Sequence, residues 1–194
     1  MKIYNKDKKY INNYINCLEK MLNVNVDQVL YNDSDGLDNK YSNSNNFNVL
    51  DLKNNYCKTM VGLVTFIAYE MRCFYQKQAI NNSNNTKYTL EEINKLKKEY
   101  EDQNSFSIYN RFDIDSFSQF DAYSFARYIT LACFELITHD FPSEHEDQIN
   151  DYIIKKIEPN YINDLTNAVN SSEINIKNTR IWILRNSWLS SFIF

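Results

Sequence analysis

The sequence predicts an α+β protein that is mostly helical, with a small β element in the first third of the chain. Most apolar residues recur three and four positions apart, which is the spacing of a helix that buries one face. Only two short runs, residues 24–30 and 47–52, are typical of strands. The chain has 194 residues and is 43% hydrophobic, so we expect a single domain, residues 1–194, with a sizeable core.

The first third of the chain contains the predicted β element. Residues 6–22 carry apolar side chains at helical spacing, so an amphipathic helix is expected first. The β-type run at 24–30 follows. Asn, Asp and Gly at 32–36 then predict a turn, because these residues tolerate left-handed backbone. Residues 47–52 alternate apolar and polar positions and are predicted as the second strand.

Two apolar helices are predicted in the middle of the chain. Residues 59–78 should form a strongly apolar helix at the centre of the fold, and residues 121–137 an aromatic-rich one. Between them, Thr89 and Glu92 have the spacing of a capping box, in which each side chain bonds the backbone N–H of the other residue. A polar helix is therefore expected from Thr89 to about residue 103.

A helical extension is predicted for residues 143–194. Ser143 and Glu146 have the spacing of a second capping box, which would begin a helix. Pro159 is expected to stop that helix, because proline lacks an N–H and its ring clashes with the preceding turn. Residues 161–169 should then resume it.

Charge and glycine content exclude several classes of function. The net charge is -4, and the 21 Lys and Arg residues are scattered along the chain. Direct nucleic-acid binding is therefore not expected, since it needs a basic surface. An acidic chain can instead dock on a basic surface of another protein. With only 2 glycines, the chain cannot form a glycine-rich phosphate loop.

Cysteine spacing and hydropathy favour a cytoplasmic location. The four cysteines are widely spaced, which argues against a structural zinc site and against a disulfide framework. The N-terminus lacks the apolar stretch of a signal peptide. The longest apolar run, residues 60–68, is too short to span a bilayer. We therefore expect a cytoplasmic protein that makes no contact with a membrane.

Residues 67–76 read I-A-Y-E-M-R-C-F-Y-Q and have the outline of the zinc-protease helix H-E-x-x-H. That helix places two histidines one turn apart so that both bind one zinc ion, and its glutamate activates the bound water. Here Tyr69 and Cys73 occupy the two histidine positions. Only Glu70 of the motif remains.

This stretch resembles the A-H-E-M-R-H-x-x-Q helix of small zinc-metallopeptidase-like (zincin-like) proteins of Gram-positive bacteria and their mobile elements. Further along, Q-F-D-A-Y-S-F-A at 119–126 resembles that family's E-x-D-A-x-x-F-A helix, whose Glu is the third zinc ligand. Gln119 stands at that third position. The strand at 47–52 lies where the family places its substrate-lining edge strand. The resemblance covers residues 24–137.

The resemblance implies a zincin-like fold that has lost its metal ligands. A phenol, a thiol and a neutral amide at Tyr69, Cys73 and Gln119 are a poor set for zinc. No metal, cofactor or catalytic residue is therefore expected, and Glu70 would remain without a metal-bound water to activate. One alternative stays open: Tyr69 and Cys73 are ordinary core residues on one helix face, and Glu70 pairs with Arg127 or lies in solvent.

The two histidines and the acidic residues near them are weaker candidates. His139 and His145 lie on either side of a proline turn without the spacing of a standard metal site, so both are expected at the surface. Glu144, Glu146 and Asp147 suit the positive end of a helix and need no further role. The alternative is a candidate interface for a partner with a basic surface.

Aromatic residues end the chain. Both tryptophans, Trp182 and Trp188, lie there, followed by Phe192 and Phe194. An apolar stripe of this kind most often closes the core of its own domain. The alternative is an exposed candidate interface for a partner or for a second copy of the chain, since Trp and Phe are common interface anchors.

The leading hypothesis is a non-catalytic protein that works by binding another protein. Its abundant Asn, Lys, Ile, Tyr and Phe have A- and T-rich codons. Together with the acidity and the resemblance to mobile-element proteins, this favours a phage-borne inhibitor of a host defence enzyme, acting in the host cytoplasm. Two alternatives remain: a metallopeptidase-like hydrolase with a non-standard metal or a thiol site at Cys73, and a self-assembling structural protein that forms homo-oligomers.

Overall fold

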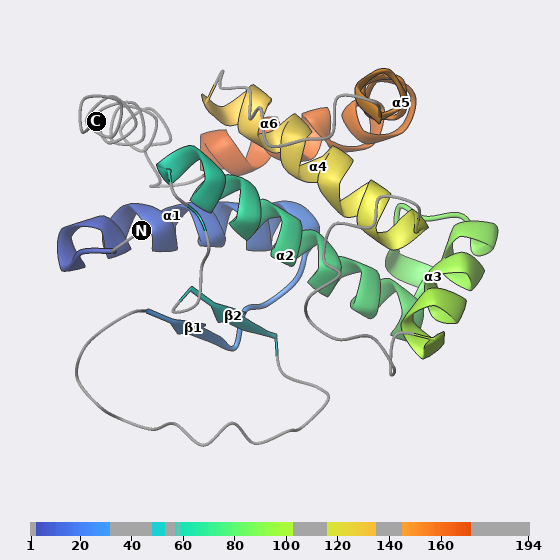
Figure 1. Cartoon of the computed structure of the whole chain (residues 1–194), viewed down its shortest axis with the longest axis horizontal. Helices are drawn as coiled ribbons and strands as arrows, with labels where there is room; N and C mark the ends of the chain where they lie inside the picture. The colour runs from blue at the N-terminus through green and yellow to red at the C-terminus, as the bar shows by residue number, and fades with distance from the viewer. Residues whose placement is uncertain are drawn as a thin grey trace.

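Helix α2, Met60–Asn81, runs through the middle of the protein and packs along α4, Phe117–Phe134 (Figure 1). The computed structural model describes residues 3–31, 48–52, 57, 59–102, 116–134 and 145–171. This part of the chain is mostly helical with a small sheet, as predicted. The remaining elements, in chain order, are α1 (Asn5–Leu22), β1 (Gln28–Leu30), β2 (Val49–Asp51), the 3-10 turn η1 (Ser83–Asn85), α3 (Leu90–Asp102), α5 (Glu146–Tyr152), the π-helical turn η5 (Ile153–Ile157) and α6 (Glu158–Ser171).

Helix α1 has the amphipathic character that the sequence predicts. At its start, the Asp7 carboxylate accepts a 3.1 Å hydrogen bond from the Tyr4 N–H. Its C-cap, Asn23, has a φ of 52°, a left-handed conformation that asparagine adopts more readily than most residues. The residues that α1 buries are spaced three and four apart: Ile11, Tyr14, Ile15, Leu18, Met21 and Leu22.

The two predicted strands pair in parallel, with Val29 opposite Leu50. Both are shorter than predicted, and β1 begins only at Gln28. Val26, two residues before it, is held by α1 instead of by a strand, because its N–H donates to the Glu19 carboxylate at 2.7 Å. A side chain of the preceding helix thus takes a backbone donor that the β-type sequence would assign to the sheet.

The capping box predicted for α3 is confirmed. The Thr89 N–H donates to the Glu92 carboxylate at 2.7 Å, and the Glu92 N–H donates to the Thr89 hydroxyl at 3.3 Å. At α2, the Thr59 hydroxyl accepts from the Gly62 N–H at 3.1 Å. Both helices therefore begin where a side-chain oxygen satisfies a free N–H of the first turn.

Helix α4 begins at Phe117, earlier than the predicted residue 121. Its start is capped by another helix: the two Glu99 carboxylate oxygens accept from the N–H groups of Phe117 and Ser118, each at 2.8 Å. A carboxylate is favourable at the positive end of a helix. Because Glu99 belongs to α3, the local sequence around residue 117 does not reveal this cap.

Pro159 does not stop the last helix, so that prediction is wrong. Helix α5 passes through η5 directly into α6. The wider π turn bonds the Glu158 N–H to the Ile153 carbonyl, five residues back, and relieves the clash of the proline ring with the preceding turn. The Asn160 side chain donates to the Lys156 carbonyl at 2.7 Å, which satisfies an acceptor at the bulge.

Helix α6 packs against α1, so the first and last described helices share one core. Tyr161, Leu165 and Ala168 of α6 are buried in the same cluster as the apolar faces of α1, α2 and α4.

None of the helices in the described ranges is long and apolar enough to cross a membrane. The turn predicted at 32–36 and the second capping residue, Ser143, lie outside those ranges.

Candidate functional site

The three predicted ligand positions lie together between α2 and α4. Tyr69 and Cys73 are one turn apart on α2, and Gln119 lies in the first turn of α4. The Tyr69 hydroxyl donates a hydrogen bond to the Gln119 Oε1 atom. Cys73 lies on the same face of α2 as Tyr69. Two stretches far apart in sequence therefore contribute to one site.

The groups at these positions do not suit a zinc ion. Burial, reinforced by the Glu70 charge, raises the pKa of the Cys73 thiol to about 12, so it stays protonated at neutral pH. Burial also raises the pKa of the Tyr69 phenol far above its usual value, and the Gln119 amide is neutral. Zinc requires deprotonated thiolate, imidazole or carboxylate ligands. Among the described residues, no three His, Cys, Asp or Glu side chains gather as a metal site.

Aromatic side chains surround these positions. The Tyr69 and Tyr123 rings lie 5.0 Å apart, centre to centre. The Tyr100 hydroxyl donates to the Gln76 Oε1 atom at 2.9 Å. Burial, followed by the nearby Cys73, raises the pKa of Tyr100 well above its usual value. The site is thus built from neutral phenols, an amide and a protonated thiol.

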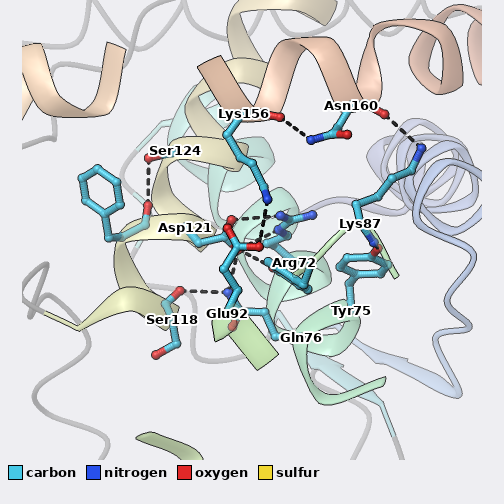
Figure 2. Close-up of polar contacts among 12 residues, drawn as sticks. Arg72, Tyr75, Gln76, Lys87, Glu92, Ser118, Asp121, Ser124, Lys156 and Asn160 are labelled. Atoms are coloured by element: carbon cyan, nitrogen blue, oxygen red, sulfur yellow. Dashed lines mark hydrogen bonds and ion pairs between the residues drawn. The ribbon is translucent and has the colours of Figure 1, made fainter. Parts of the chain in front are cut away.

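Beneath this site, Arg72 and Asp121 form a buried ion pair between α2 and α4 (Figure 2). The Arg72 Nε and Nη2 atoms donate to the two carboxylate oxygens of Asp121 at 2.8 and 2.9 Å. Their side chains are 1% and 0% exposed. A planar guanidinium suits such two-point binding of a carboxylate, and both partners are removed from water.

Further side chains complete the hydrogen bonds of this pair. The Gln76 side chain donates to the Asp121 carboxylate at 2.8 Å and to the Ser118 carbonyl at 2.9 Å. The Tyr152 hydroxyl donates to Asp121 at 2.9 Å. The Tyr88 hydroxyl also donates to Asp121, and the Tyr161 hydroxyl accepts from Arg72. Together these residues, Arg72, Gln76, Tyr88, Asp121, Tyr152 and Tyr161, form the Arg72–Asp121 network.

The charges of the network are held by one another. Burial alone would raise the pKa of Asp121, but the Arg72 charge and the hydrogen bonds from Arg72, Tyr88 and Gln76 hold it below its usual value. Burial alone would lower the pKa of Arg72, yet the Asp121 carboxylate holds it well above its usual value. Both side chains are therefore charged at neutral pH.

Aromatic rings enclose the Arg72 guanidinium. Its carbon lies 4.8 Å from the Tyr88 ring centre and 5.0 Å from those of Tyr75 and Tyr161. Cation–π attraction at these distances stabilises a desolvated cation. This explains how the apolar helix α2 accommodates an arginine that is 1% exposed.

The Arg72–Asp121 network accounts for part of both sequence stretches described above. Arg72 and Gln76 belong to the first stretch and Asp121 to the second, and both Arg72 and Gln76 donate to the Asp121 carboxylate. These three residues fall within the two motif stretches, but the sequence alone does not reveal the contacts between them. Tyr88, Tyr152 and Tyr161 carry no motif, and the last two lie on either side of the π turn.

The other predicted site residues lie elsewhere. His145 is the N-cap of α5 and makes no side-chain cap bond. Glu146 and Asp147 are exposed in the first turn of α5, and Glu146 forms a 2.6 Å ion pair with Arg127, the predicted alternative partner of Glu70. Six predicted residues lie outside the described ranges: His139, Glu144, Trp182, Trp188, Phe192 and Phe194.

Comparison of the chain with protein families, with curated proteins and with solved structures finds no match.

Proposed function

We propose that the chain is a non-catalytic, zincin-like protein that acts by binding another protein. The observation that carries this proposal is the contact between Tyr69 and Gln119, beside a protonated Cys73. Where a zincin would hold two imidazoles and a carboxylate around a metal, this chain has neutral groups that bond to each other. Such a site can neither hold zinc firmly nor activate water.

The chemistry of Cys73 also disfavours the enzymatic alternative. A nucleophilic cysteine acts as a thiolate and sits in positive surroundings that lower its pKa. Here burial and the neighbouring Glu70 carboxylate raise the pKa of the thiol to about 12. The thiol is therefore unreactive at neutral pH, and a surface function explains the chain better than a catalytic one.

The proposed partner is a protein with a basic surface, such as the nucleic-acid groove of a host defence enzyme that a phage must block. The chain has a net charge of -4. On α5, Glu146 and Asp147 are exposed in the first turn, and Asp151 is exposed one turn later. Complementary charge would steer the encounter and raise its rate.

The test has two steps. Expression of the chain in Gram-positive cells identifies a candidate defence enzyme that the chain inhibits. Binding of the purified full chain to that enzyme is then measured. We expect a complex of defined stoichiometry by light scattering. The double variant Asp147→Lys/Asp151→Lys should lower the association rate about tenfold or more. The matched control, Glu101→Lys/Asp102→Lys on α3, should leave that rate within about twofold.

Three outcomes would overturn the proposal. One is stoichiometric zinc in purified protein that is lost on Cys73→Ala, since this would reveal a metal site. Another is hydrolysis of peptides that the same variant abolishes. The third is a stable homo-oligomer that binds no other protein, because this would favour the self-assembling structural protein.

A further inference from the structure

We propose that a hollow between α1, α2 and α6 binds a small molecule that carries a phosphate group. The hollow has a volume of about 410 Å³, which lies in the range of small-molecule sites and exceeds what a bare ion needs. It is lined by Tyr75 of α2 and not by Tyr69, Cys73 or Gln119. The proposal is therefore independent of the protein-binding function.

The wall of the hollow is fixed by hydrogen bonds. The Tyr75 hydroxyl accepts from the Lys87 N–H at 2.6 Å and from the Thr86 hydroxyl at 3.2 Å. The Thr86 hydroxyl in turn accepts from the Tyr88 N–H at 3.2 Å. These bonds hold the segment between η1 and α3 on α2, so a ligand would meet a preformed wall.

The floor of the hollow is aromatic. The Tyr75 and Tyr161 rings lie 6.5 Å apart, nearly perpendicular, and both are buried. Behind them the Arg72 guanidinium contacts both rings. Tyr161 belongs to the Arg72–Asp121 network, so the floor of the hollow is anchored to that network.

The charges on the rim favour an anion. Two ammonium groups, Lys20 and Lys87, line the hollow with a single carboxylate, Asp164. Lys87 binds Asp164 at 2.8 Å and the Asn160 carbonyl at 3.1 Å. Lys20, at the end of α1, has no hydrogen-bonded or ion-paired partner in the described part of the chain. One positive charge is thus left over for a ligand.

A phosphate monoester fits this rim. Its charge of nearly -2 and its three acceptor oxygens can engage both ammonium groups, and it would compete with Asp164 for Lys87. The Asn84 and Thr86 side chains, also on the rim, can bond to the rest of the molecule. A sugar phosphate combines an anion with hydroxyl groups of this kind.

The test is calorimetric titration of the full chain with ribose 5-phosphate, with inorganic phosphate, citrate and ribose as comparisons. We expect ribose 5-phosphate to bind most tightly and ribose not to bind. Lys20→Ala and Lys87→Ala should each weaken the affinity about tenfold. Asp164→Asn should strengthen it, because the competing carboxylate is gone. Lys77→Ala, an exposed lysine elsewhere on α2, is the matched control and should change nothing.

The opposite results would overturn the proposal. Lys20 is exposed and unpaired in the described structure, so Lys20→Ala should fold normally. If Lys20→Ala and Lys77→Ala bind ribose 5-phosphate with equal affinity, the proposed site is excluded. Citrate binding as tightly as ribose 5-phosphate would show a general anion surface. No heat from ribose 5-phosphate at millimolar concentration would exclude the ligand class.

Discussion

Asp121 binds side chains from α2, from the segment before α3 and from the end of α5, and each of them donates to its carboxylate. Asp121→Asn would leave the buried Arg72 without its counter-charge. We expect a loss of about 3–5 kcal/mol in the free energy of unfolding, measured by urea denaturation. Glu91→Gln, which removes an exposed ion pair with Lys95, should leave the free energy of unfolding nearly unchanged, because water screens that pair. Equal losses would contradict a structural role for the network.

Asp121 also predicts how stability responds to acid. Its folded-state pKa is lowered, so near pH 4 the unfolded chain binds more protons than the folded one. The stability that Asp121 contributes is therefore present above its unfolded pKa of about 3.9 and is lost as pH falls through the folded value. Urea unfolding from pH 7 to pH 2 should show a steeper loss for the wild type than for Asp121→Asn. Parallel curves would mean that Asp121 is not the responsible carboxyl.

The contact between Tyr69 and Gln119 can be tested as a vestige of a metal site. The triple variant Tyr69→His/Cys73→His/Gln119→Glu restores the zincin ligand types, and two of its positions, Tyr69 and Gln119, already contact each other. We expect it to retain one zinc ion per chain after dialysis, measured by atomic absorption. The wild type should retain none.

A control variant makes that result specific. Tyr4→His/Cys57→His/Gln28→Glu introduces the same residue types outside the Tyr69–Gln119 site. It should not retain zinc. If neither triple variant does so while both stay folded, the arrangement of α2 and α4 is not that of a zincin.

At the scale of elements, the π turn η5 decides which side chains of the last helix reach the network. At about 100° per residue, Tyr152 and Tyr161 would lie about 180° apart on an unbroken α-helix. A π bulge carries one extra residue, which reduces the angle to about 80°. Both hydroxyls therefore reach the Arg72–Asp121 pair.

A deletion tests this role of the π turn. Removing Ile154, which is 65% exposed, should convert η5 into regular α-helix. The side chains before and after η5 should then keep the directions in which they point now. We expect a change of under about 1.5 kcal/mol in the free energy of unfolding. Removing the exposed Asn163 instead rotates Leu165 and Ala168 out of the core and should cost several-fold more. Equal costs would show that η5 has no such tolerance.

The sequence predicted those elements whose signals are local. The capping box of Thr89 and Glu92 and the apolar periodicity of α1 needed only neighbouring residues, and both are correct. The start of α4 was missed because its cap, Glu99, comes from another helix. Pro159 was misjudged because the rule for proline assumes a regular α-helix, and η5 is a π turn.

The same contrast applies to the candidate site. A helix–helix motif placed Tyr69, Cys73 and Gln119 in one region, and the structure shows Tyr69 and Gln119 in contact. The sequence could not assign Arg72 its role, because a charged residue in an apolar helix is explained only by its partner. Asp121 lies on another helix, and Tyr161 enters through the π turn.

At the scale of the whole molecule, one apolar cluster includes residues of α1, α2, α4 and α6. We therefore expect a single cooperative unfolding transition for the full chain, because no described helix has a core of its own. Thermal melts followed by far-ultraviolet and near-ultraviolet circular dichroism should coincide. Two separate midpoints would instead indicate that the helices after residue 143 form an independent unit.

The packing of α1 against α6 has a consequence for synthesis on the ribosome. The apolar face of α1, with Ile11 and Leu18, emerges first, but its partner residues Leu165 and Ala168 are among the last described. At about 5–20 residues per second, this face waits on the order of ten seconds or more for its partner. The nascent chain should therefore engage chaperones through its first helix, and its release should depend on completion of α6.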